Sequence, residues 1–324
     1  MIFFMEETIL KVKDLSIKFD IGLNIKKFTA VRNVDFELKK GHVLGIVGES
    51  GSGKSQIALS ILGLCDKNAS VSGEIIYKNT NLLKLSETQL NKFRWNHIAI
   101  VLQNAMSTFN PYMTLRNQLI EPLVYHKGVS VQDAERKAIE LLDLVKIPDV
   151  KNRILLYPHE FSGGMLQRAM IAMALICDPK ILIADEITSG VDVTTQIQIL
   201  KLLHEVQRNM GMSLIFISHD LGVLSKIANE VIVMYCGHIM EYTTMKNLIC
   251  NPVSPYTRGL INSIPQLDKN FDRLEYIEGE TPNVDNMPAG CPFCTRCKFA
   301  LPKCFTQKPN LKNVEEEHSV SCFL

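Results

Sequence analysis

Residues 48–55 read Gly-Glu-Ser-Gly-Ser-Gly-Lys-Ser, and this stretch decides the fold. The apolar run 43–47 before it predicts a buried strand, and apolar residues at helical spacing after it predict a helix that ends near Gly63. Three glycines let successive backbone N–H groups turn toward an anion, while Lys54 and the Ser55 hydroxyl suit a nucleotide phosphate and Mg²⁺. The stretch therefore predicts a phosphate-binding loop for a nucleoside triphosphate.

The apolar run 181–184 ends in two acids, Asp185 and Glu186. Carboxylates at the carboxyl end of a buried parallel strand lie where α/β sheets bind ligands. In that place Asp185 suits the Mg²⁺ shell, and Glu186 suits the polarisation of an attacking water. The pair predicts a hydrolytic site, against the simpler interpretation of solvated acids at a strand end.

Two more predicted strands end in residues that can reach a γ-phosphate. Residues 214–217 are followed closely by His219, and residues 98–102 are followed by Gln103. A histidine beside the nucleotide can contact the γ-phosphate, and a glutamine amide can sense it through Mg²⁺ and the attacking water. We expect both side chains to take part in hydrolysis.

Residues 162–168 read Ser-Gly-Gly-Met-Leu-Gln-Arg and open an apolar helix predicted for residues 165–176. Small residues at a helix N-terminus form an anion site. Residues 48–55 already bind the phosphates of one nucleotide. The natural occupant of the anion site at residues 162–164 is therefore a second nucleotide, bound by another subunit. The two motifs together predict a pair of subunits that close around ATP.

The order of the elements predicts an α/β fold with a domain boundary near Asn251. Residues 1–47 alternate apolar and polar positions, which indicates β-rich chain, and a helical segment at about 194–210 separates two strand-like runs as in a parallel crossover. Two short apolar stretches around Gly237 predict a closing hairpin. Beyond residue 250 the hydrophobic periodicity fades and prolines accumulate.

Composition argues against several classes of function. The 324 residues are 46% hydrophobic and 21% charged, with a formal net charge of +1, which gives no support to broad nucleic-acid binding. No run approaches the roughly 18 consecutive apolar residues of a membrane span. Residues 1–5 lack a basic segment and meet Glu6 and Glu7, so we predict no signal peptide. A role at a membrane would require docking onto other chains from the cytosol.

Five of the nine cysteines lie within residues 291–324. The spacing Cys291-x₂-Cys294-x₂-Cys297 brings three thiols to one point, and Cys304 or Cys322 can supply a fourth. An odd count without an export signal argues against disulfides. The cluster therefore predicts a bound metal, either an iron–sulfur cluster or Zn²⁺.

These motifs make the chain similar to the ABC-type ATPases. Each motif of that family has a counterpart: residues 48–55 for Walker A, Gln103 for the Q-loop, 161–168 for the signature, 181–186 for Walker B, 189–192 for the D-loop and His219 for the switch histidine. The resemblance covers residues 8–324. It implies a RecA-like core with an N-terminal antiparallel β part, forming an ATPase domain at 1–250 with an inserted helical subdomain at about 104–177. A small Cys-rich extension at 251–324 is implied to follow.

The resemblance also implies the residues of the site. The residues implied to contact ATP are Phe19, Gly48, Ser50, Gly51, Ser52, Gly53, Lys54, Ser55, Gln103, Ser162, Gly163, Gly164 and Asp192, with Phe19 as the aromatic that stacks on adenine. The side chains implied to hold Mg²⁺ are Ser55, Gln103 and Asp185. The catalytic residues are implied to be Glu186, His219 and Gln103.

Three stretches (102–111, 157–160 and 252–257) make the chain resemble the ATP-binding subunits of bacterial oligopeptide, dipeptide and nickel importers. This resemblance implies a peripheral subunit at the cytoplasmic face of the cell membrane that powers the import of di- or oligopeptides. The implied partners are a homologous second ATPase in a heterodimer, two transmembrane permeases and an extracellular solute-binding protein, with no nucleic acid. The permease coupling helix is implied to dock near residues 103–111.

Two other functions remain as alternatives. One is the ATPase of a nickel or metal-chelate importer. The other is a soluble ABC protein of translation or DNA repair. Such proteins usually carry two ATPase domains or a long coiled-coil insertion, and this sequence has neither, so we favour this alternative less.

The same importers often carry a 4Fe–4S cluster on cysteines that match Cys291, Cys297, Cys304 and Cys322. The resemblance therefore implies such a cluster here, with Cys294 as an extra candidate and Zn²⁺ as the alternative. We expect its role to be structural, because nothing near it in the sequence indicates an electron partner.

The sequence departs from the family pattern beside the catalytic acid. Ile187 stands where the family usually has proline, and Gly190-Val191 replaces the common Ala-Leu of the D-loop. Isoleucine restores a backbone N–H, and glycine loosens the loop. Neither change removes a chemical group, so we expect an ATPase that is slowed at most.

Overall fold

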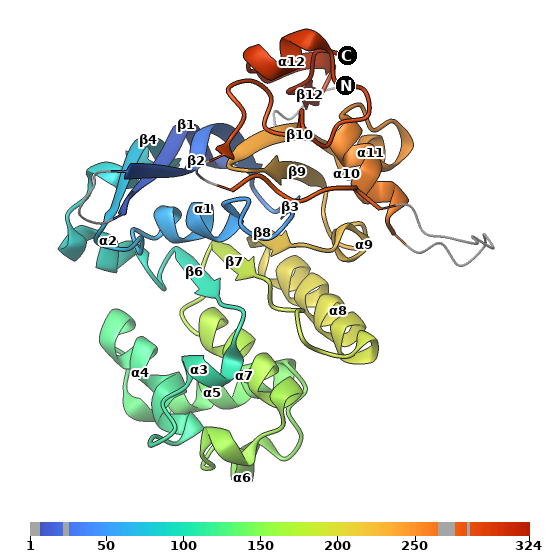
Figure 1. Cartoon of the computed structure of the whole chain (residues 1–324). Coiled ribbons are helices and arrows are strands. Elements are labelled where there is room, and N and C mark those ends of the chain that lie inside the picture. Colours follow the sequence, from blue (N-terminus) through green and yellow to red (C-terminus); the bar gives the residue numbers. More distant parts are fainter. Residues whose placement is uncertain (1–6, 22–25, 265–275, 284–285) are drawn as a thin grey trace, which may run out of the picture. The chain divides into compact units, whose positions relative to one another are not determined.

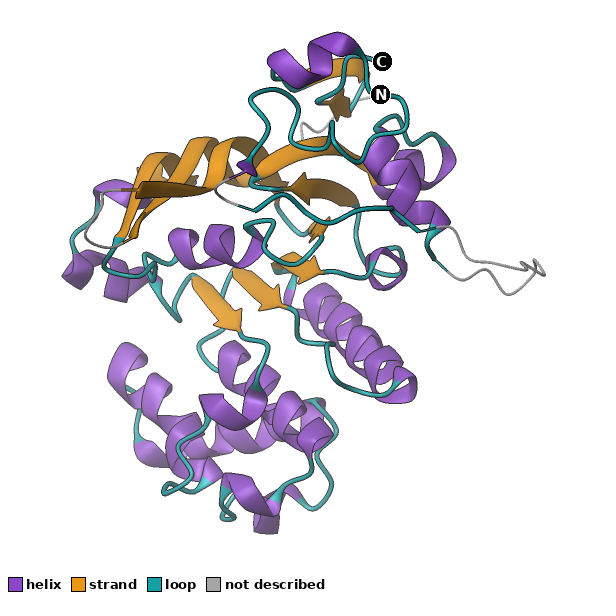
Figure 2. Ribbon diagram, in the orientation of Figure 1, coloured by secondary structure: helices purple, strands orange, loops and turns teal. Residues whose placement is uncertain are grey.

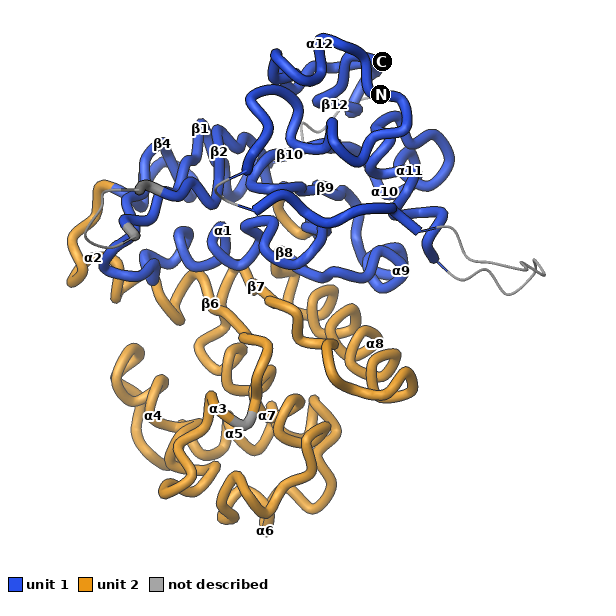
Figure 3. The backbone as a smooth tube through the Cα atoms, viewed as in Figure 1, with its two compact units in different colours: residues 1–39, 43–83, 216–324 blue, residues 40–42, 84–215 orange. Residues whose placement is uncertain are grey.

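The computed structural model describes residues 7–21, 26–264, 276–283 and 286–324, with its elements labelled in Figure 1. The chain divides into two compact units (Figure 3). Unit 1 comprises residues 1–39, 43–83 and 216–324, and unit 2 comprises residues 40–42 and 84–215. No helix in the described part of the chain has the length and apolar character needed to cross a membrane.

Unit 1 contains most of the strands and the whole described C-terminal region. Its strands are β1 (Thr8–Ile21), β2 (Lys26–Lys39), β3 (Val43–Gly48), β4 (Ala69–Tyr77), β5 (Thr80–Asn81), β9 (Glu230–Tyr235), β10 (His238–Thr244), β11 (Lys312–Glu315) and β12 (His318–Val320). Its helices are α1 (Lys54–Ile61), α9 (Leu221–Leu224), α10 (Met245–Cys250), α11 (Pro255–Asn262) and α12 (Pro302–Thr306). The strand β8 (Ser213–Ser218) and the short 3-10 helix η1 (Leu82–Lys84) each have residues in both units.

An antiparallel sheet opens unit 1, with strand order β2-β1-β4-β5. Buried residues alternate with exposed or half-buried ones along parts of β1 and β2, for example at Leu10 and Val12 and at Val34, Phe36 and Leu38. This alternation places one face of the sheet against the core. It is the β-rich N-terminal part that the sequence predicts.

The second sheet of unit 1 surrounds the central strand β3. All six residues of β3 are buried, and the strand pairs in parallel with β9, from Leu44 opposite Glu230 to Gly48 opposite Met234. A continuous apolar run is typical of a strand that is covered on both faces. The turn at Gly237 then returns the chain as β10, antiparallel to β9, which is the predicted hairpin.

The predicted domain boundary near Asn251 does not coincide with a division between compact units, because residues on both sides belong to unit 1. Strand β12 pairs with β10, so the tail extends the same sheet. A buried hydrogen bond joins them: His318 Nε2 lies 2.8 Å from Glu241 Oε1, and the two Glu241 oxygens accept the backbone N–H groups of Val253 and Ser254. The domain ranges stay a prediction.

Unit 2 combines a two-stranded parallel piece of sheet with a group of helices. Its elements are α2 (Glu87–Phe93), β6 (Ile98–Val101), α3 (Ala105–Thr108), α4 (Leu115–Lys127), α5 (Val131–Leu144), α6 (Val150–Arg153), η2 (Pro158–Glu160), α7 (Gly163–Leu175), β7 (Ile181–Asp185) and α8 (Val193–Met210). Strands β6 and β7 pair in parallel, with Ile98 opposite Ile181. Between residues 104 and 177 every regular element is a helix (Figure 2), as expected for the inserted subdomain.

Candidate nucleotide site

The phosphate-binding loop lies in unit 1 and joins β3 to α1. A side chain at two of its glycines would clash with backbone: a Cβ at Gly48 would lie 2.1 Å from the Met234 carbonyl oxygen, and one at Gly53 would lie 2.5 Å from the Ala30 carbonyl oxygen. Gly53 also has a φ of 96°, a left-handed conformation that favours glycine. The loop therefore passes so close to neighbouring strands that only glycine fits at these positions.

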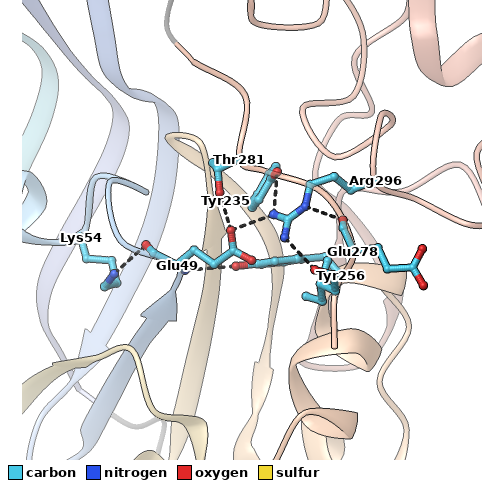
Figure 4. Close-up of polar contacts among 8 residues, drawn as sticks. Glu49, Lys54, Tyr235, Tyr256, Glu278, Thr281 and Arg296 are labelled. Carbon is cyan, nitrogen blue, oxygen red and sulfur yellow. Dashed lines mark hydrogen bonds and ion pairs between the residues drawn. The ribbon is translucent and has the colours of Figure 1, made fainter. Parts of the chain in front are cut away.

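The predicted phosphate lysine is held inside this loop. The side chain of Lys54 is buried, and its Nζ donates to the Gly48 carbonyl oxygen at 2.9 Å. It also donates to the Glu49 carbonyl oxygen at 3.0 Å (Figure 4). Helix α1, which begins at Lys54, has no acidic residue in its first turn. Positive charge at a helix N-terminus, together with the backbone N–H groups of the loop, can bind a phosphate.

The remaining predicted nucleotide contacts of the loop differ in exposure. Ser50 and Gly51 are exposed and Ser55 is half-buried, whereas Ser52 is buried with 2% of its surface exposed. The Ser52 carbonyl oxygen accepts the N–H of Gly237 at 3.0 Å, so the turn between β9 and β10 fixes the loop from one side. The exposed members lie on the part of the loop that a ligand can reach.

Two further predicted residues lie in unit 1. Phe19 is half-buried on β1, and its ring is stacked on that of Phe28 on the paired strand β2, with centroids 6.4 Å apart. His219 is exposed and follows β8, one residue before Asp220 caps α9. The roles of Phe19 at adenine and of His219 at the γ-phosphate stay predictions.

The predicted catalytic acid belongs to unit 2. Asp185 is the buried last residue of β7, and Glu186 follows it with a φ of 49°, in the left-handed region that residues with a side chain rarely adopt. Backbone strain of this kind gathers at functional sites, where the surrounding structure holds it in place. The next residue, Ile187, is fully buried and anchors the turn.

A chain of hydrogen bonds joins Gln103 to the backbone of Glu186. The side-chain amide of Gln103 donates to the Ser189 hydroxyl at 2.9 Å, and that hydroxyl donates to the Glu186 carbonyl oxygen at 2.7 Å. Gln103 and Asp185 stand at the carboxyl ends of β6 and β7, which pair in parallel, so both reach the same edge of the sheet. The sequence predicted Gln103 and Glu186 separately, but nothing in it indicated that Ser189 links them.

The predicted cap for a second nucleotide opens helix α7. Ser162 is the N-cap and accepts the Met165 N–H at 3.4 Å, and both Ser162 and Gly163 are exposed. A Cβ on Gly163 would meet nothing within 4 Å, so this helix end is open to a partner. The first turn of α7 contains no acid, which leaves its N–H groups suited to an anion.

Asp192 caps helix α8. Its carboxylate accepts the Thr195 N–H at 2.9 Å and the Thr195 hydroxyl at 2.7 Å. These hydrogen bonds lower the pKa of Asp192. The predicted contact of Asp192 with nucleotide therefore involves a carboxylate that is already ionised and fixed as a helix cap.

The five tail cysteines line one small cavity of about 20 Å³. Burial is the main cause that raises the pKa of the Cys291 thiol to about 12, and it also raises the pKa values of Cys294 and Cys297. Among the described residues, no three His, Cys, Asp or Glu side chains are placed so that they could hold a metal ion. The donor type suits a thiolate-binding metal, but the thiols would have to ionise and move to bind one.

Comparison with known proteins agrees with these motifs. Residues 31–189 match the family described as ABC transporter, and residues 240–304 match the family described as oligopeptide/dipeptide transporter, C-terminal region. The second match begins in β10 and crosses the predicted boundary near Asn251. The chain thus carries a transporter ATPase region and a region typical of peptide transporters.

Three curated relatives align over nearly the whole chain. An oligopeptide transport ATP-binding protein of Haemophilus influenzae is 47% identical, over 91% of each chain. One of Escherichia coli is 44% identical, over 94% of this chain and 89% of the relative. A dipeptide transport ATP-binding protein of Lactococcus lactis is 45% identical, over 98% of this chain and 91% of the relative.

Two solved structures that resemble this fold are described as an ATP-binding cassette and as part of an ABC transporter complex. One is a dimeric cassette in a post-hydrolysis state with bound ADP and Pi; it is 26% identical, has a TM-score of 0.65, and covers 73% of this chain and 98% of its own. Another, from Clostridium perfringens and part of an ABC transporter complex, has the same identity and TM-score, and covers 76% of this chain and 92% of its own. These matches agree with the predicted cassette fold.

Proposed function

We propose that this chain, which belongs to the ABC transporter family of ATP-binding proteins and to its oligopeptide and dipeptide branch, binds and hydrolyses ATP to power the import of peptides. The observation that carries the proposal is the phosphate loop, in which Lys54 is the first residue of α1 and its ammonium group bonds to the loop backbone. The chain that contains this loop aligns along its length with peptide-transport ATP-binding proteins. ATP and Mg²⁺ are the ligands expected for an ABC ATPase.

The proposed roles divide between the two units. In unit 1, Lys54 and the loop N–H groups bind the β- and γ-phosphates, Ser55 ligates Mg²⁺, Phe19 stacks on adenine and His219 contacts the γ-phosphate. In unit 2, Asp185 and Gln103 complete the Mg²⁺ shell, and Glu186 polarises the attacking water. The backbone strain at Glu186 and the Gln103–Ser189 bond support these roles, because they fix the acid and the amide before reaction.

The proposal also assigns a partner to the open N-terminus of α7. Ser162, Gly163 and Gly164 would cap the nucleotide bound by a second, homologous ATPase, with Asp192 near the same interface. The dimeric form of one similar cassette supports this arrangement. We propose that the second ATPase is a different chain and that two permeases and an extracellular solute-binding protein complete an importer, with this subunit on the cytoplasmic face of the membrane.

A transport experiment tests the function. The chain would be produced with its partner ATPase and permeases, reconstituted in liposomes, and supplied with ATP and labelled dipeptides, longer peptides or Ni²⁺. We expect peptide uptake that depends on ATP and is lost in the Lys54→Ala variant, because the phosphate loop then lacks its ammonium. Uptake of Ni²⁺ alone would favour the metal-importer alternative, and failure to associate with any permease would contradict a transport role.

For the tail we propose a 4Fe–4S cluster on Cys291, Cys297, Cys304 and Cys322, with Zn²⁺ as the alternative metal. The shared cavity of these thiols supports the proposal. When bound, such a cluster would cross-link the tail and supply structural stability. Analysis of iron, acid-labile sulfide and zinc in anaerobically purified protein tests it. We expect Cys291→Ser to lose the metal and Cys294→Ser to keep it, and protein free of both metals would contradict it.

A further inference from the structure

The phosphate loop is fastened to the C-terminal tail through a residue that no motif singles out. Glu49 follows Gly48 in the loop, and its carboxylate oxygen Oε2 accepts hydrogen bonds from Arg296 Nη1 at 2.8 Å and from the Thr281 hydroxyl at 2.6 Å (Figure 4). Arg296 and Thr281 are both more than 200 positions away in the sequence. All three residues belong to unit 1.

The backbone of Glu49 is held as well as its side chain. Its N–H donates to the Tyr256 hydroxyl at 3.1 Å, and its carbonyl oxygen accepts from Lys54 Nζ at 3.0 Å. Tyr256 is fully buried on α11, so this contact cannot swing aside without unpacking the helix. Glu49 therefore connects the tail on one side to the phosphate lysine on the other.

The side chain of Arg296 is buried and forms several hydrogen bonds. Its side chain is 7% exposed, and besides Glu49 its guanidinium donates to the Tyr235 hydroxyl and to the carbonyl oxygens of Ile277 and Glu278. Burial lowers the pKa of Arg296, but the hydrogen bonds to Glu49 and Tyr235 outweigh it, and the pKa is raised. All three guanidinium nitrogens are used, and their planar geometry fixes the direction of the Glu49 carboxylate.

The position of Arg296 in the sequence adds a second consequence. It lies between Cys294 and Cys297, inside the loop whose thiols line the tail cavity. Any rearrangement of these cysteines must displace Arg296 or its neighbours. Arg296 donates a hydrogen bond to the Glu49 side chain, and Lys54 donates one to the Glu49 carbonyl oxygen. A short, largely buried path thus connects the cysteine loop to the phosphate loop.

We propose that Arg296 and Glu49 are positioning residues for the phosphate loop, so that the conformation of the cysteine tail sets the affinity for ATP. The proposal rests on the ATP-binding function proposed above. Arg296 touches no part of the predicted nucleotide contact set, so it acts only through Glu49 and the loop backbone. Since coupling between two sites is reciprocal, ATP binding in turn stabilises the tail conformation that carries Arg296.

The experiment measures the dissociation constant of the fluorescent analogue mant-ATP for the full chain and its variants. We expect Arg296→Met and Glu49→Gln each to raise this constant by about 5- to 50-fold, which lies within the range typical of coupled sites. The double variant should be no weaker than the worse single one, because both remove the same link. Arg296→Lys, which keeps the charge without the planar fork, should restore part of the affinity.

A matched control and a milder variant separate positioning from general stability. Lys298→Met removes a cation two residues further along, which is 69% exposed and pairs with Glu278 at 3.4 Å, and it should leave the affinity unchanged. Thr281→Val removes a single hydroxyl from the Glu49 carboxylate and should raise the dissociation constant by about 2- to 5-fold without unfolding the chain. Turnover at saturating ATP in the assembled transporter should stay within about twofold of the unmodified protein for the Arg296, Thr281 and Lys298 variants.

The outcomes are distinct. If Arg296→Met and Thr281→Val lower the melting temperature but bind mant-ATP as tightly as the unmodified chain, Arg296 is only a structural contact and the inference is overturned. If Lys298→Met weakens binding as much as Arg296→Met, the effect is a general charge effect and the inference fails. If the unmodified chain does not bind mant-ATP, both the proposed function and this inference are overturned.

Discussion

The phosphate loop of unit 1 and the catalytic turn of unit 2 are held by different kinds of contact. Glu49 in the loop forms hydrogen bonds with Tyr256 in α11 and with Thr281 and Arg296 in the tail. These partners lie 207, 232 and 247 positions further along the chain. The turn after β7 is held by the Ser189–Glu186 bond across three positions and by Gln103, which follows the adjacent strand β6. The loop thus depends on distant segments of the chain, whereas the turn is largely built by its own strand pair.

This difference indicates that the phosphate loop of unit 1 and the catalytic turn of unit 2 can be altered by separate substitutions. Changes in the tail should act on nucleotide binding through the loop. Changes near β7 should act on hydrolysis and leave binding intact. Substitutions in each unit, and a change of pH, test whether binding and hydrolysis are separable in this way.

The largest effect is expected from Glu186→Gln in unit 2. The amide keeps the shape of the side chain but cannot accept a proton from water, so turnover should fall by about 100- to 10,000-fold. Affinity for ATP should be unchanged, because the loop around Lys54 is untouched. Single-turnover hydrolysis and mant-ATP binding in the assembled transporter measure the two quantities. Equal losses in both would break the separation, and near-normal turnover would refute the role of Glu186.

The next effect is expected from Gly48→Ala in unit 1. The new Cβ would lie 2.1 Å from the Met234 carbonyl oxygen, so the backbone must move, at a cost of about 3 kcal/mol of unfolding free energy or more. ATP affinity should fall along with stability, as urea unfolding and nucleotide binding would measure. Gly41→Ala is the control: its φ of 74° is strained for alanine but its Cβ would meet no atom within 4 Å, so it should cost only about 1–2 kcal/mol.

A third prediction concerns the acid sensitivity of unit 1. His238 follows Gly237, whose N–H binds the Ser52 carbonyl oxygen, and burial is the main cause that lowers the pKa of His238 to about 4. In the unfolded chain this histidine has an ordinary pKa near 6.5 and binds a proton first. Its contribution to stability is therefore complete above pH 6.5 and is lost as the pH falls toward 4, by about 1–2 kcal/mol between pH 7 and pH 5.

Urea unfolding of the unmodified chain and of His238→Gln at the two pH values measures this contribution. The variant should show a smaller loss of stability on acidification than the unmodified chain. If both chains lose the same unfolding free energy between pH 7 and pH 5, His238 does not control the acid response of this region.

The smallest effect is expected from Ser189→Ala in unit 2. It removes the hydroxyl between Gln103 and the Glu186 carbonyl oxygen, so stability should fall by about 1 kcal/mol, and turnover by about 3- to 10-fold at unchanged ATP affinity. Ser263→Ala, which removes a comparable hydroxyl bond to the Leu260 carbonyl oxygen, should leave turnover alone. A larger effect on ATP affinity than on turnover would show that the turn also shapes the binding half.

Sequence reasoning located the elements and the candidate side chains, but not how they are held. The run 43–47 predicted β3, in which all six residues are buried, and the helical segment at about 194–210 predicted α8. It placed Gln103 and Glu186 at strand ends, where the structure has them. The assignment of each side chain to ATP, Mg²⁺ or the cluster stays a prediction, because such roles depend on ligands.

The sequence did not indicate the contacts that attach residues after 251 to the rest of unit 1, and the predicted domain ranges stay a prediction. Fading periodicity and gathered cysteines set a boundary near Asn251, but β12 pairs with β10 and the buried Glu241–His318 contact ties the tail to the sheet of unit 1. Strand β12 has only three residues, so its alternation of buried and exposed side chains is too short to be recognised in the sequence. Strand β12 pairs with β10 on the side of β10 that does not pair with β9, and this position follows from the fold of unit 1.

By itself, the sequence determined the phosphate loop, the strands that lead into it and the family, because glycine spacing and apolar period are local properties of the chain. Only the tertiary structure decided that Glu49 meets Arg296, 247 positions away, and that Ser189 joins Gln103 to Glu186. A pair of opposite charges has no period and no fixed spacing, so its partners are set by packing. The physical reason is that hydrogen bonds and ion pairs act over a few ångströms in space, whatever the distance along the chain.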